Sequence, residues 1–312
     1  MSIESNSLAA QAPAAASRLA SALPLLAVLA AVVLWGGSFA AMKGLVAELG
    51  PWSVMWLRMA VALAVLLPLA PRLRPAGYRP GDWRKLTPMV ALQPCLYFLL
   101  EANALIRTSS AQAGVIAASV PLLVGLGAFL FLGERLRPAR LAGLVSATAG
   151  VAWLTMQSVP TAAAADPLLG NLMEVGAMAC AAASMLLLKD LARRYPPLSL
   201  TALQILAGFL FFLPGAPAVL ARGISGWSAG QAAAGLYLGA GVTLGAFGLY
   251  NWGLSRLPAS RASACINLVP VVAVAIGWLA LGEGLGPGQL AAAGLVLTGV
   301  IVSQDQGEGR RP

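Results

Sequence analysis

Ten runs of mostly apolar residues, each about as long as a lipid bilayer is thick, follow one another along this chain. A helix needs about 20 such residues to cross the hydrocarbon core. The stretches between the runs are rich in glycine, proline or charge, as loops are. The sequence therefore predicts an all-α integral membrane protein with ten transmembrane helices, at residues 23–42, 51–70, 86–106, 111–132, 139–157, 168–189, 198–220, 230–253, 260–281 and 287–303.

Composition agrees with a membrane-embedded chain. Of the 312 residues, 59% are hydrophobic and only 10% are charged, whereas a soluble domain carries about 25% charged residues. The net charge of +9 is spread thinly between apolar runs, without the basic patch that a nucleic-acid partner would need. We expect the lipid bilayer to be the partner, and no nucleic acid.

The positive charges of the loops predict the orientation. Counted from a cytoplasmic N-terminus, 16 lysines and arginines fall in inside segments and three in outside segments. Cytoplasmic loops of membrane proteins carry an excess of these residues. The count therefore predicts that both termini face the cytoplasm, which also requires an even number of crossings.

The chain contains an internal repeat. The phrase "LGERLRP" at residues 132–138 returns as "LGEGLGP" at residues 281–287. At the same spacing Arg107, Pro121 and Pro138 return as Arg256, Pro270 and Pro287, and slightly earlier in each copy Lys43 and Pro51 return as Lys189 and Pro197. The chain thus contains a unit of five spans twice. Because five is an odd number, the second unit must enter the membrane from the opposite side, so the sequence predicts inverted repeats. Inverted repeats that rock about a central site are a common design of secondary transporters.

The repeat also predicts how the chain divides. We expect a disordered N-terminal tail, a first repeat of five helices, a linker, a second repeat of five helices and a short C-terminal tail. These cover residues 1–22, 23–157, 158–167, 168–303 and 304–312.

Three stretches carry a family resemblance: "LWGGSFAAMK" at 34–43, "SSAQAGVIAASVPLLVGLGAFLFLGERL" at 109–136 and "ASRASACINLVPVVAVAIGWLALGEGL" at 259–285. They resemble the two EamA domains of the drug/metabolite transporter superfamily. The resemblance implies ten helices in a 5 + 5 inverted fold with a central cavity. It also implies export or exchange of small metabolites, as in bacterial amino-acid exporters of the YddG type.

The repeated phrase has a structural interpretation. Pro138 and Pro287 suit the first turn of a helix, where the missing N–H is no loss. We expect Glu134 and Glu283 to accept hydrogen bonds from the exposed amides at the start of the helix that follows each of them. Pro121 and Pro270 fall within matching spans, where we expect them to bend two helices and to serve in gating.

Ionisable residues inside spans are expensive and are usually paired or functional. Arg58, Glu101 and Glu174 fall at similar depth in the outer half of their spans, with Lys43 at the outer rim. One interpretation is an ion pair of Arg58 with Glu101 or Glu174 that fixes helix packing. The other is a polar vestibule of two acids and two bases, which suits a zwitterionic solute.

Aromatic and amide side chains complete the predicted site, because small organic solutes bind in aromatic-walled cavities with a few polar groups. The alternative role for the amides is hydrogen bonding between helices. The candidate substrate-binding residues are Trp35, Ser38, Arg58, Tyr97, Glu101, Asn103, Glu174, Asn251, Trp252 and Asn267.

Several classes of function are excluded or ranked lower. The sequence has no histidine, no paired-acid motif and no nucleophile elbow, so we expect neither an enzyme nor a metal or other cofactor. Without a Walker A motif, the chain by itself is not an ATP-driven pump.

We expect export of amino acids or related zwitterions across a bacterial cytoplasmic membrane, by a monomer or a homodimer. The alternatives are a nucleotide-sugar or sugar-phosphate exchanger and a drug or toxic-metabolite exporter. Glu101 or Glu174 could carry a proton, and facilitated diffusion fits equally well.

Overall fold

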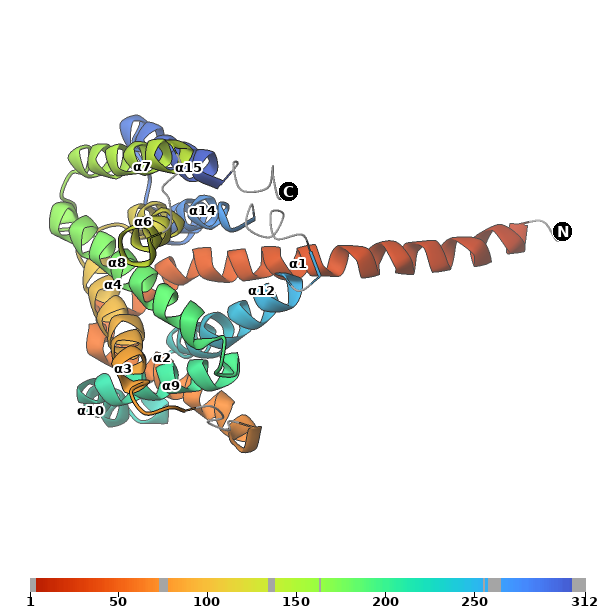
Figure 1. The fold of residues 1–312 in the computed structure, drawn as a ribbon, viewed down its shortest axis with the longest axis horizontal. Helices are drawn as coiled ribbons and strands as arrows, with labels where there is room; N and C mark the ends of the chain where they lie inside the picture. The colour runs from red at the N-terminus through yellow and green to blue at the C-terminus, as the bar shows by residue number, and fades with distance from the viewer. Residues whose placement is uncertain are drawn as a thin grey trace.

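The computed structural model describes residues 4–72, 78–133, 138–162, 164–254, 256–257 and 265–304. Within them every long element is helical, and the shape is a bundle from which the N-terminal part of α1 projects (Figure 1). The first half of the chain forms α1 (Glu4–Leu49), α2 (Pro51–Leu66), the 3-10 helix η1 (Leu67–Arg72), α3 (Trp83–Val90), the π-helical η2 (Ala91–Leu96), α4 (Tyr97–Leu105), α5 (Ser110–Ala117), α6 (Val120–Leu132) and α7 (Pro138–Met156).

The second half repeats this series of helices. It forms α8 (Pro167–Leu191), α9 (Pro197–Phe211), η3 (Leu213–Gly215), α10 (Ala216–Ala221), η4 (Ile224–Gly226), α11 (Ala229–Leu236), the π-helical η5 (Tyr237–Ala246), α12 (Phe247–Leu254), α14 (Val269–Leu281) and α15 (Pro287–Gln304).

Six helical stretches of the described residues are long and apolar enough to cross a membrane. They are Ala22–Leu49, Pro51–Pro71, Ser110–Phe131, Pro138–Met156, Pro167–Leu191 and Ala229–Gly253. A seventh stretch, Pro197–Phe211 with Leu213–Ala221, is bent by 53°, and α14 and α15 are shorter apolar helices. The chain is thus an all-helical membrane protein, whereas ten crossings and their direction remain predictions.

Two expected elements differ in the structure. The residues expected as a disordered tail are helical from Glu4 onward and continue into α1. Their sequence is rich in alanine, the residue with the highest helix propensity. The expected span 198–220 is broken at Phe212, because Pro214 has no N–H to continue the helix and Gly215 lies against the backbone of Trp52.

The two halves share backbone details at the repeat spacing of 149 residues. Gly133 ends α6 with φ 66° and ψ 18°, and Gly282 ends α14 with φ 69° and ψ 16°. Glycine suits both sites because this left-handed conformation is strained for residues with a Cβ. Ser119 and Leu268, which precede α6 and α14, also have nearly the same backbone angles. The sequence repeat is therefore also a structural repeat.

The third helix of each half contains a π-helical segment, η2 and η5. In η2, Gln93 leaves helical geometry next to Pro94, and Gln204 of α9 donates to the released Gln93 carbonyl at 3.1 Å. In η5, the Thr243 hydroxyl donates to the Leu238 carbonyl at 2.8 Å. In both segments a side chain thus bonds a backbone carbonyl at the altered turn.

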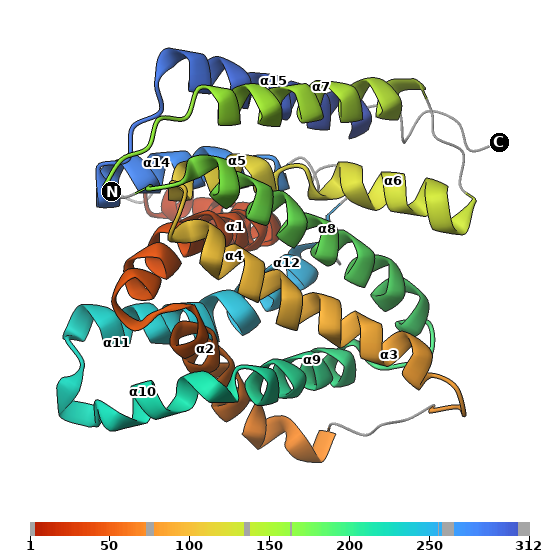
Figure 2. The same ribbon diagram turned by 90° about the vertical axis from the view of Figure 1, so that its left-hand side faces the viewer.

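The last helices of the two halves, α7 and α15, lie side by side at one edge of the bundle (Figure 2). Gly143 and Gly299 face each other there. A Cβ on Gly143 would come within 2.4 Å of the Gly299 carbonyl oxygen, and a Cβ on Gly299 within 2.6 Å of the Gly143 carbonyl oxygen. This close approach of two backbones is typical of membrane helices.

Candidate functional site

Arg58 lies in the interior of α2 and is only 6% exposed. Its Nε donates to the Thr243 hydroxyl of η5 at 2.9 Å, and its Nη1 lies 3.8 Å from the Met42 sulfur of α1. The guanidinium carbon also lies 4.3 Å from the centre of the Phe98 ring. The cation is therefore held by a hydroxyl and an aromatic face, and its contacts join the first half of the chain to the second.

Glu101 and Tyr97 are one turn apart on α4. The Tyr97 hydroxyl donates to Glu101 Oε1 at 2.6 Å, and Glu101 is 4% exposed. Residues four apart on a helix share a face, which explains how the sequence places both groups on the same side of α4. Arg58 and Glu101 act electrostatically on each other.

Glu174 lies on α8, which packs against α4, and its exposed fraction is 0%. Neither carboxyl oxygen has a hydrogen-bond partner among the described residues. Glu174 is close enough to Glu101 for the two carboxyl groups to interact electrostatically. The buried Arg58, Glu101 and Glu174 and the half-buried Tyr97 thus form one group, called here the central cluster, from helices of both halves.

The expected direct ion pair of Arg58 is not formed. Within the part of the chain that the structure describes, neither Glu101 nor Glu174 has a carboxyl oxygen within 4.0 Å of the Arg58 nitrogens. The Arg58 Nε instead donates a hydrogen bond to the Thr243 hydroxyl. The expected vestibule is also smaller, because Lys43 belongs to a different network.

Trp35 belongs to an aromatic group between α1 and α12. Its ring centre lies 5.3 Å from those of both Phe247 and Tyr250. The Tyr237 hydroxyl donates to the Leu34 carbonyl at 2.6 Å one residue away. Sequence reasoning selected Trp35 but missed Phe247 and Tyr237, because an aromatic residue in an apolar run carries no positional signal of its own.

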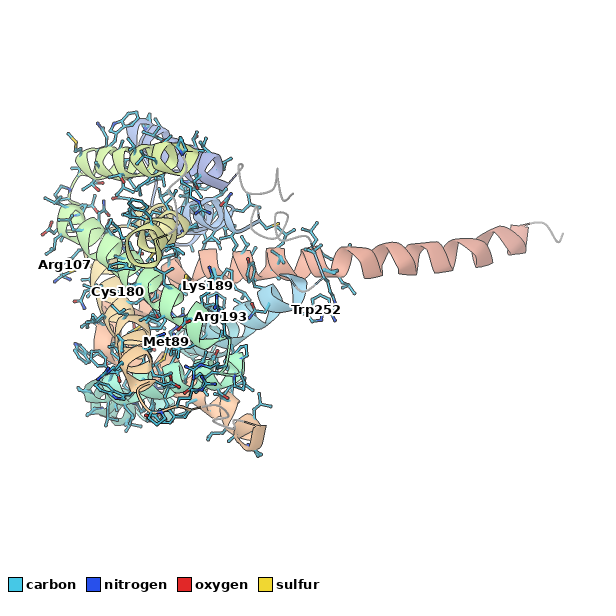
Figure 3. All side chains as sticks on the ribbon, in the orientation of Figure 1. Met89, Arg107, Cys180, Lys189, Arg193 and Trp252 are labelled. Atoms are coloured by element: carbon cyan, nitrogen blue, oxygen red, sulfur yellow. The ribbon has the colours of Figure 1, made fainter. Side chains whose placement is uncertain are left out.

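Trp252 lies apart from the central cluster. It is 40% exposed, and the Arg256 guanidinium carbon lies 4.3 Å from its ring centre. Figure 3 shows Trp252 at the end of α12 beside α1, away from α4 and α8. The neighbouring Asn251 is exposed as well. Both residues are therefore outside the group that the structure brings together.

The remaining polar candidates bond mainly within their own helices. The Ser38 hydroxyl donates to the Trp35 carbonyl at 2.7 Å, and the Asn103 amide donates to the Leu99 carbonyl at 2.8 Å. Asn267 is half-buried just before α14.

Pro121 and Pro270 occupy the first turns of α6 and α14, directly after an interruption of the helix.

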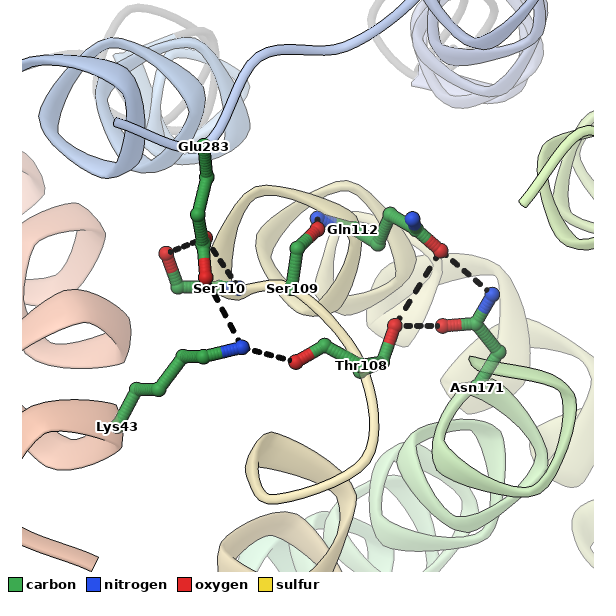
Figure 4. A network of polar contacts seen from close by, with 7 residues as sticks. All are labelled: Lys43, Thr108, Ser109, Ser110, Gln112, Asn171 and Glu283. Carbon is green, nitrogen blue, oxygen red and sulfur yellow. Dashed lines mark hydrogen bonds and ion pairs between the residues drawn. The ribbon is translucent and has the colours of Figure 1, made fainter. Parts of the chain in front are cut away.

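Glu283 has the expected kind of partner but on an unexpected helix. Its Oε2 accepts from the Ser110 amide at 2.8 Å and from the Ser110 hydroxyl at 2.6 Å, at the start of α5 (Figure 4). We had expected the start of the following helix, α15. The left-handed Gly282 turns the chain back, and Gly277 leaves room for the carboxyl beside Ser110. Glu134 lies outside the described residues.

Lys43 completes this Glu283 network. Its ammonium lies 2.9 Å from Glu283 Oε1 and donates to the Thr108 carbonyl at 2.5 Å. A second set of bonds continues from Thr108, whose hydroxyl donates to Asn171 Oδ1 at 2.6 Å, while the Asn171 amide donates to Gln112 Oε1 at 2.9 Å. Sequence reasoning missed Thr108, Gln112 and Asn171. The only signal was their position at the ends of apolar runs.

At the opposite end of the bundle, Asp82 joins the loops of the two halves. It accepts from Arg194 at 2.7 and 3.1 Å, from the Tyr195 hydroxyl at 2.7 Å and from the Arg79 amide at 2.9 Å. These bonds, those of Arg194 first, hold the pKa of the Asp82 carboxyl well below its usual range.

The described residues contain no group of three His, Cys, Asp or Glu that could hold a metal ion.

Comparison with known proteins supplies the family. The "Uncharacterized transporter" of Archaeoglobus fulgidus is 27% identical over 87% of this chain and 95% of its own length. A "Probable terminal-alkyne amino-acid exporter" of Streptantibioticus cattleyicolor is 28% identical over 91% of this chain and 94% of its own. The "Uncharacterized transporter YcxC" of Bacillus subtilis is 27% identical over 86% of this chain and 88% of its own length.

The fold and the domain pattern agree with these relatives. A solved crystal structure superposes with a TM-score of 0.57 at 20% identity, covering 90% of this chain and 96% of the other. The sequence profile described as "EamA-like transporter family" matches twice, at residues 22–156 and 168–303, which together make up most of the chain. With two matches that leave only the termini and a short linker uncovered, the chain belongs to the EamA-like transporter family.

Proposed function

We propose that this EamA-family transporter exports amino acids or related small zwitterionic compounds across the cytoplasmic membrane. The observation that carries the proposal is the central cluster, which places one guanidinium and two carboxyls in a buried group between the two repeats. A zwitterion offers the matching charges, a carboxylate for Arg58 and an ammonium for Glu101 and Glu174. One relative, of Streptantibioticus cattleyicolor, is described as a "Probable terminal-alkyne amino-acid exporter", which agrees with this substrate class.

The proposed mechanism is alternating access. Ten spans in two inverted sets of five, with both termini in the cytoplasm, would place the central cluster at the interface of the sets. Rocking of one set against the other would then expose it to each side in turn. Thr243 of the second half holds Arg58 of the first, so relative motion of the halves would alter the cation's surroundings directly.

Flux measurements test the substrate class. Purified protein in proteoliposomes would be assayed for counterflow with each of the radiolabelled proteinogenic amino acids, and with a hexose phosphate and a lipophilic cation as representatives of the alternatives. We expect counterflow with one or more amino acids and none with the other two. Exclusive counterflow of the hexose phosphate would support an exchanger of phosphorylated sugars and contradict the proposal.

Variants test the site. Arg58→Ala and Glu101→Gln each remove one charged partner of the substrate. A hydrogen bond to a charged group contributes about 1.5–3 kcal/mol, so we expect a loss of roughly ten- to a hundredfold in counterflow rate at low substrate. The matched control is Glu48→Gln, which changes an exposed carboxyl of α1 that accepts from Gln231. Wild-type flux in both cluster variants, at normal folding, would contradict the site.

Labelling tests the inverted topology. In a chain whose three native cysteines are replaced by alanine, Arg84→Cys and Gly230→Cys place a thiol in the corresponding turns of the two repeats. An impermeant maleimide applied to whole cells should label only the Gly230→Cys variant. Labelling of both from the same side would exclude inverted repeats.

A further inference from the structure

Glu174 is a buried carboxyl without a hydrogen-bond partner among the residues that the structure describes. Its exposed fraction is 0%, and neither oxygen accepts a hydrogen bond within the described part of the chain. An ionised carboxylate in an apolar interior is expensive unless it is paired and hydrogen-bonded. No described residue supplies that bond, so the charged form of Glu174 needs a partner from outside this part of the chain.

The neighbouring groups are already engaged. Glu101 accepts from the Tyr97 hydroxyl at 2.6 Å, and Arg58 donates to Thr243 at 2.9 Å. Arg58 acts electrostatically on Glu101, the other carboxyl of the cluster. One cation serves two carboxyls, so the substrate-free cluster is neutral when one of them carries a proton. Glu174 has no hydrogen-bond donor among the described residues, so its charged form is less well stabilised than that of Glu101.

Among the residues that the structure describes, no other ionisable group near Glu174 offers compensation. Among the elements packed against α8, α4 contributes Tyr97 and Glu101, and η2 contributes the Cys95 thiol. The residues of α5 and α6 include no ionisable side chain. Arg84 and Lys85 of α3 and Arg140 of α7 lie at the ends of their helices, and Lys85 pairs with Asp190 at 2.6 Å.

We propose that Glu174 is a proton-binding site whose proton exchanges for the ammonium group of the substrate. On binding, the substrate ammonium donates to the Glu174 carboxylate, the proton leaves to water, and the substrate carboxylate pairs with Arg58. On release to the other side, Glu174 takes up a proton again. Proton and substrate thus occupy Glu174 in turn and move in opposite directions. This inference rests on the proposed function, because it adds an exchanged ion to the same site.

The first test needs no substrate. Dicyclohexylcarbodiimide, which dissolves in membranes, reacts with protonated carboxyls, so intact mass spectrometry of the purified protein should show an adduct whose yield falls as pH rises. We expect the adduct in wild type and in the exposed control Glu48→Gln, and its loss in Glu174→Gln. An unchanged adduct in Glu174→Gln, with peptide mapping to another residue, would overturn the proposal, and so would the absence of any adduct from wild type.

The second test measures coupling, with the labelled amino acid that gives the strongest counterflow. With the membrane potential clamped at zero by potassium and valinomycin, one-to-one exchange against a gradient of one pH unit drives up to about tenfold accumulation. We expect accumulation in wild type and Glu48→Gln, and a ratio of one in Glu174→Gln whatever its residual rate. Accumulation driven by a sodium gradient, or a ratio of one in wild type under the pH gradient, would overturn the proposal while leaving amino-acid transport intact. Absence of amino-acid counterflow would instead refute the proposed function, and the adduct would still decide whether Glu174 binds a proton.

Discussion

Lys43 and Glu283 form a buried ion pair, nitrogen to oxygen 2.9 Å, that joins the first helix of one EamA repeat to the fourth-helix end of the other. Glu283 also accepts two hydrogen bonds from Ser110. Oε1 of Glu283 thus faces the Lys43 ammonium and Oε2 faces Ser110, and the pair connects three elements that are distant in sequence.

Removing one member of this pair should destabilise the protein strongly. Lys43→Met leaves a buried carboxylate without its cation, which costs about 3–5 kcal/mol. Lys85→Met is the matched control, because the Lys85–Asp190 pair is exposed and worth at most about 1 kcal/mol. Unfolding midpoints in detergent would measure both variants. Equal, small losses would show that the buried pair contributes no more than the exposed one.

The glycine contact between α7 and α15 should tolerate no side chain. Gly143→Ala places a methyl group 2.4 Å from the Gly299 carbonyl oxygen, so the helices must separate. We expect a loss of about 1–3 kcal/mol, the usual cost of overpacking. Gly294→Ala on α15 is the control, since a Cβ there meets nothing within 4 Å. A Gly143→Ala variant as stable as Gly294→Ala would contradict this packing.

Acid should weaken the contact between the loops at Asp82. In the unfolded chain this carboxyl titrates near its ordinary value, about 3.9, whereas in the folded protein the hydrogen bonds from Arg194, Tyr195 and the Arg79 amide lower its pKa. Its contribution is thus fully present above about pH 4 and is lost as the pH falls further, because the unfolded chain binds the proton first. Unfolding midpoints measured from about pH 6 down to about pH 3 should fall less steeply in Asp82→Asn than in wild type. An identical dependence of the midpoint on pH in wild type and variant would contradict this role of Asp82.

Pro121 and Pro270 are predicted to matter for transport more than for stability. Each occupies the first turn after an interrupted helix, where proline is well accommodated. Replacement by alanine supplies an N–H that lets the helix continue, so we expect slower counterflow with a stability change below about 1 kcal/mol. Counterflow at the wild-type rate in both variants would show that the interruptions do not depend on proline.

The sequence predicted helices, repeats and charged positions well, because each has a periodic or compositional signal. The doubled "LGE" phrase correctly indicated equivalent turns at Gly133 and Gly282. The buried positions of Arg58, Glu101 and Glu174 followed from the rarity of charge in apolar runs.

Partners across helices were not predictable in the same way. Pairing depends on helix rotation and on side-chain reach, which repeat spacing does not encode. Lys43 was therefore assigned to the wrong group, and Glu283 was assigned to α15 rather than to α5. Thr243, which holds Arg58, lies in a π-helical segment whose altered turn shifts the register of the residues beyond it.

The central cluster takes Arg58, Tyr97 and Glu101 from residues 22–156 and Glu174 from residues 168–303, where Thr243, the partner of Arg58, also lies. A polypeptide ending at the linker would consequently carry an incomplete set of charges. Under the proposed inverted topology, two fragments translated separately would restore transport by assembling in antiparallel orientation, so complementation by split genes would require each fragment to insert with its own polarity.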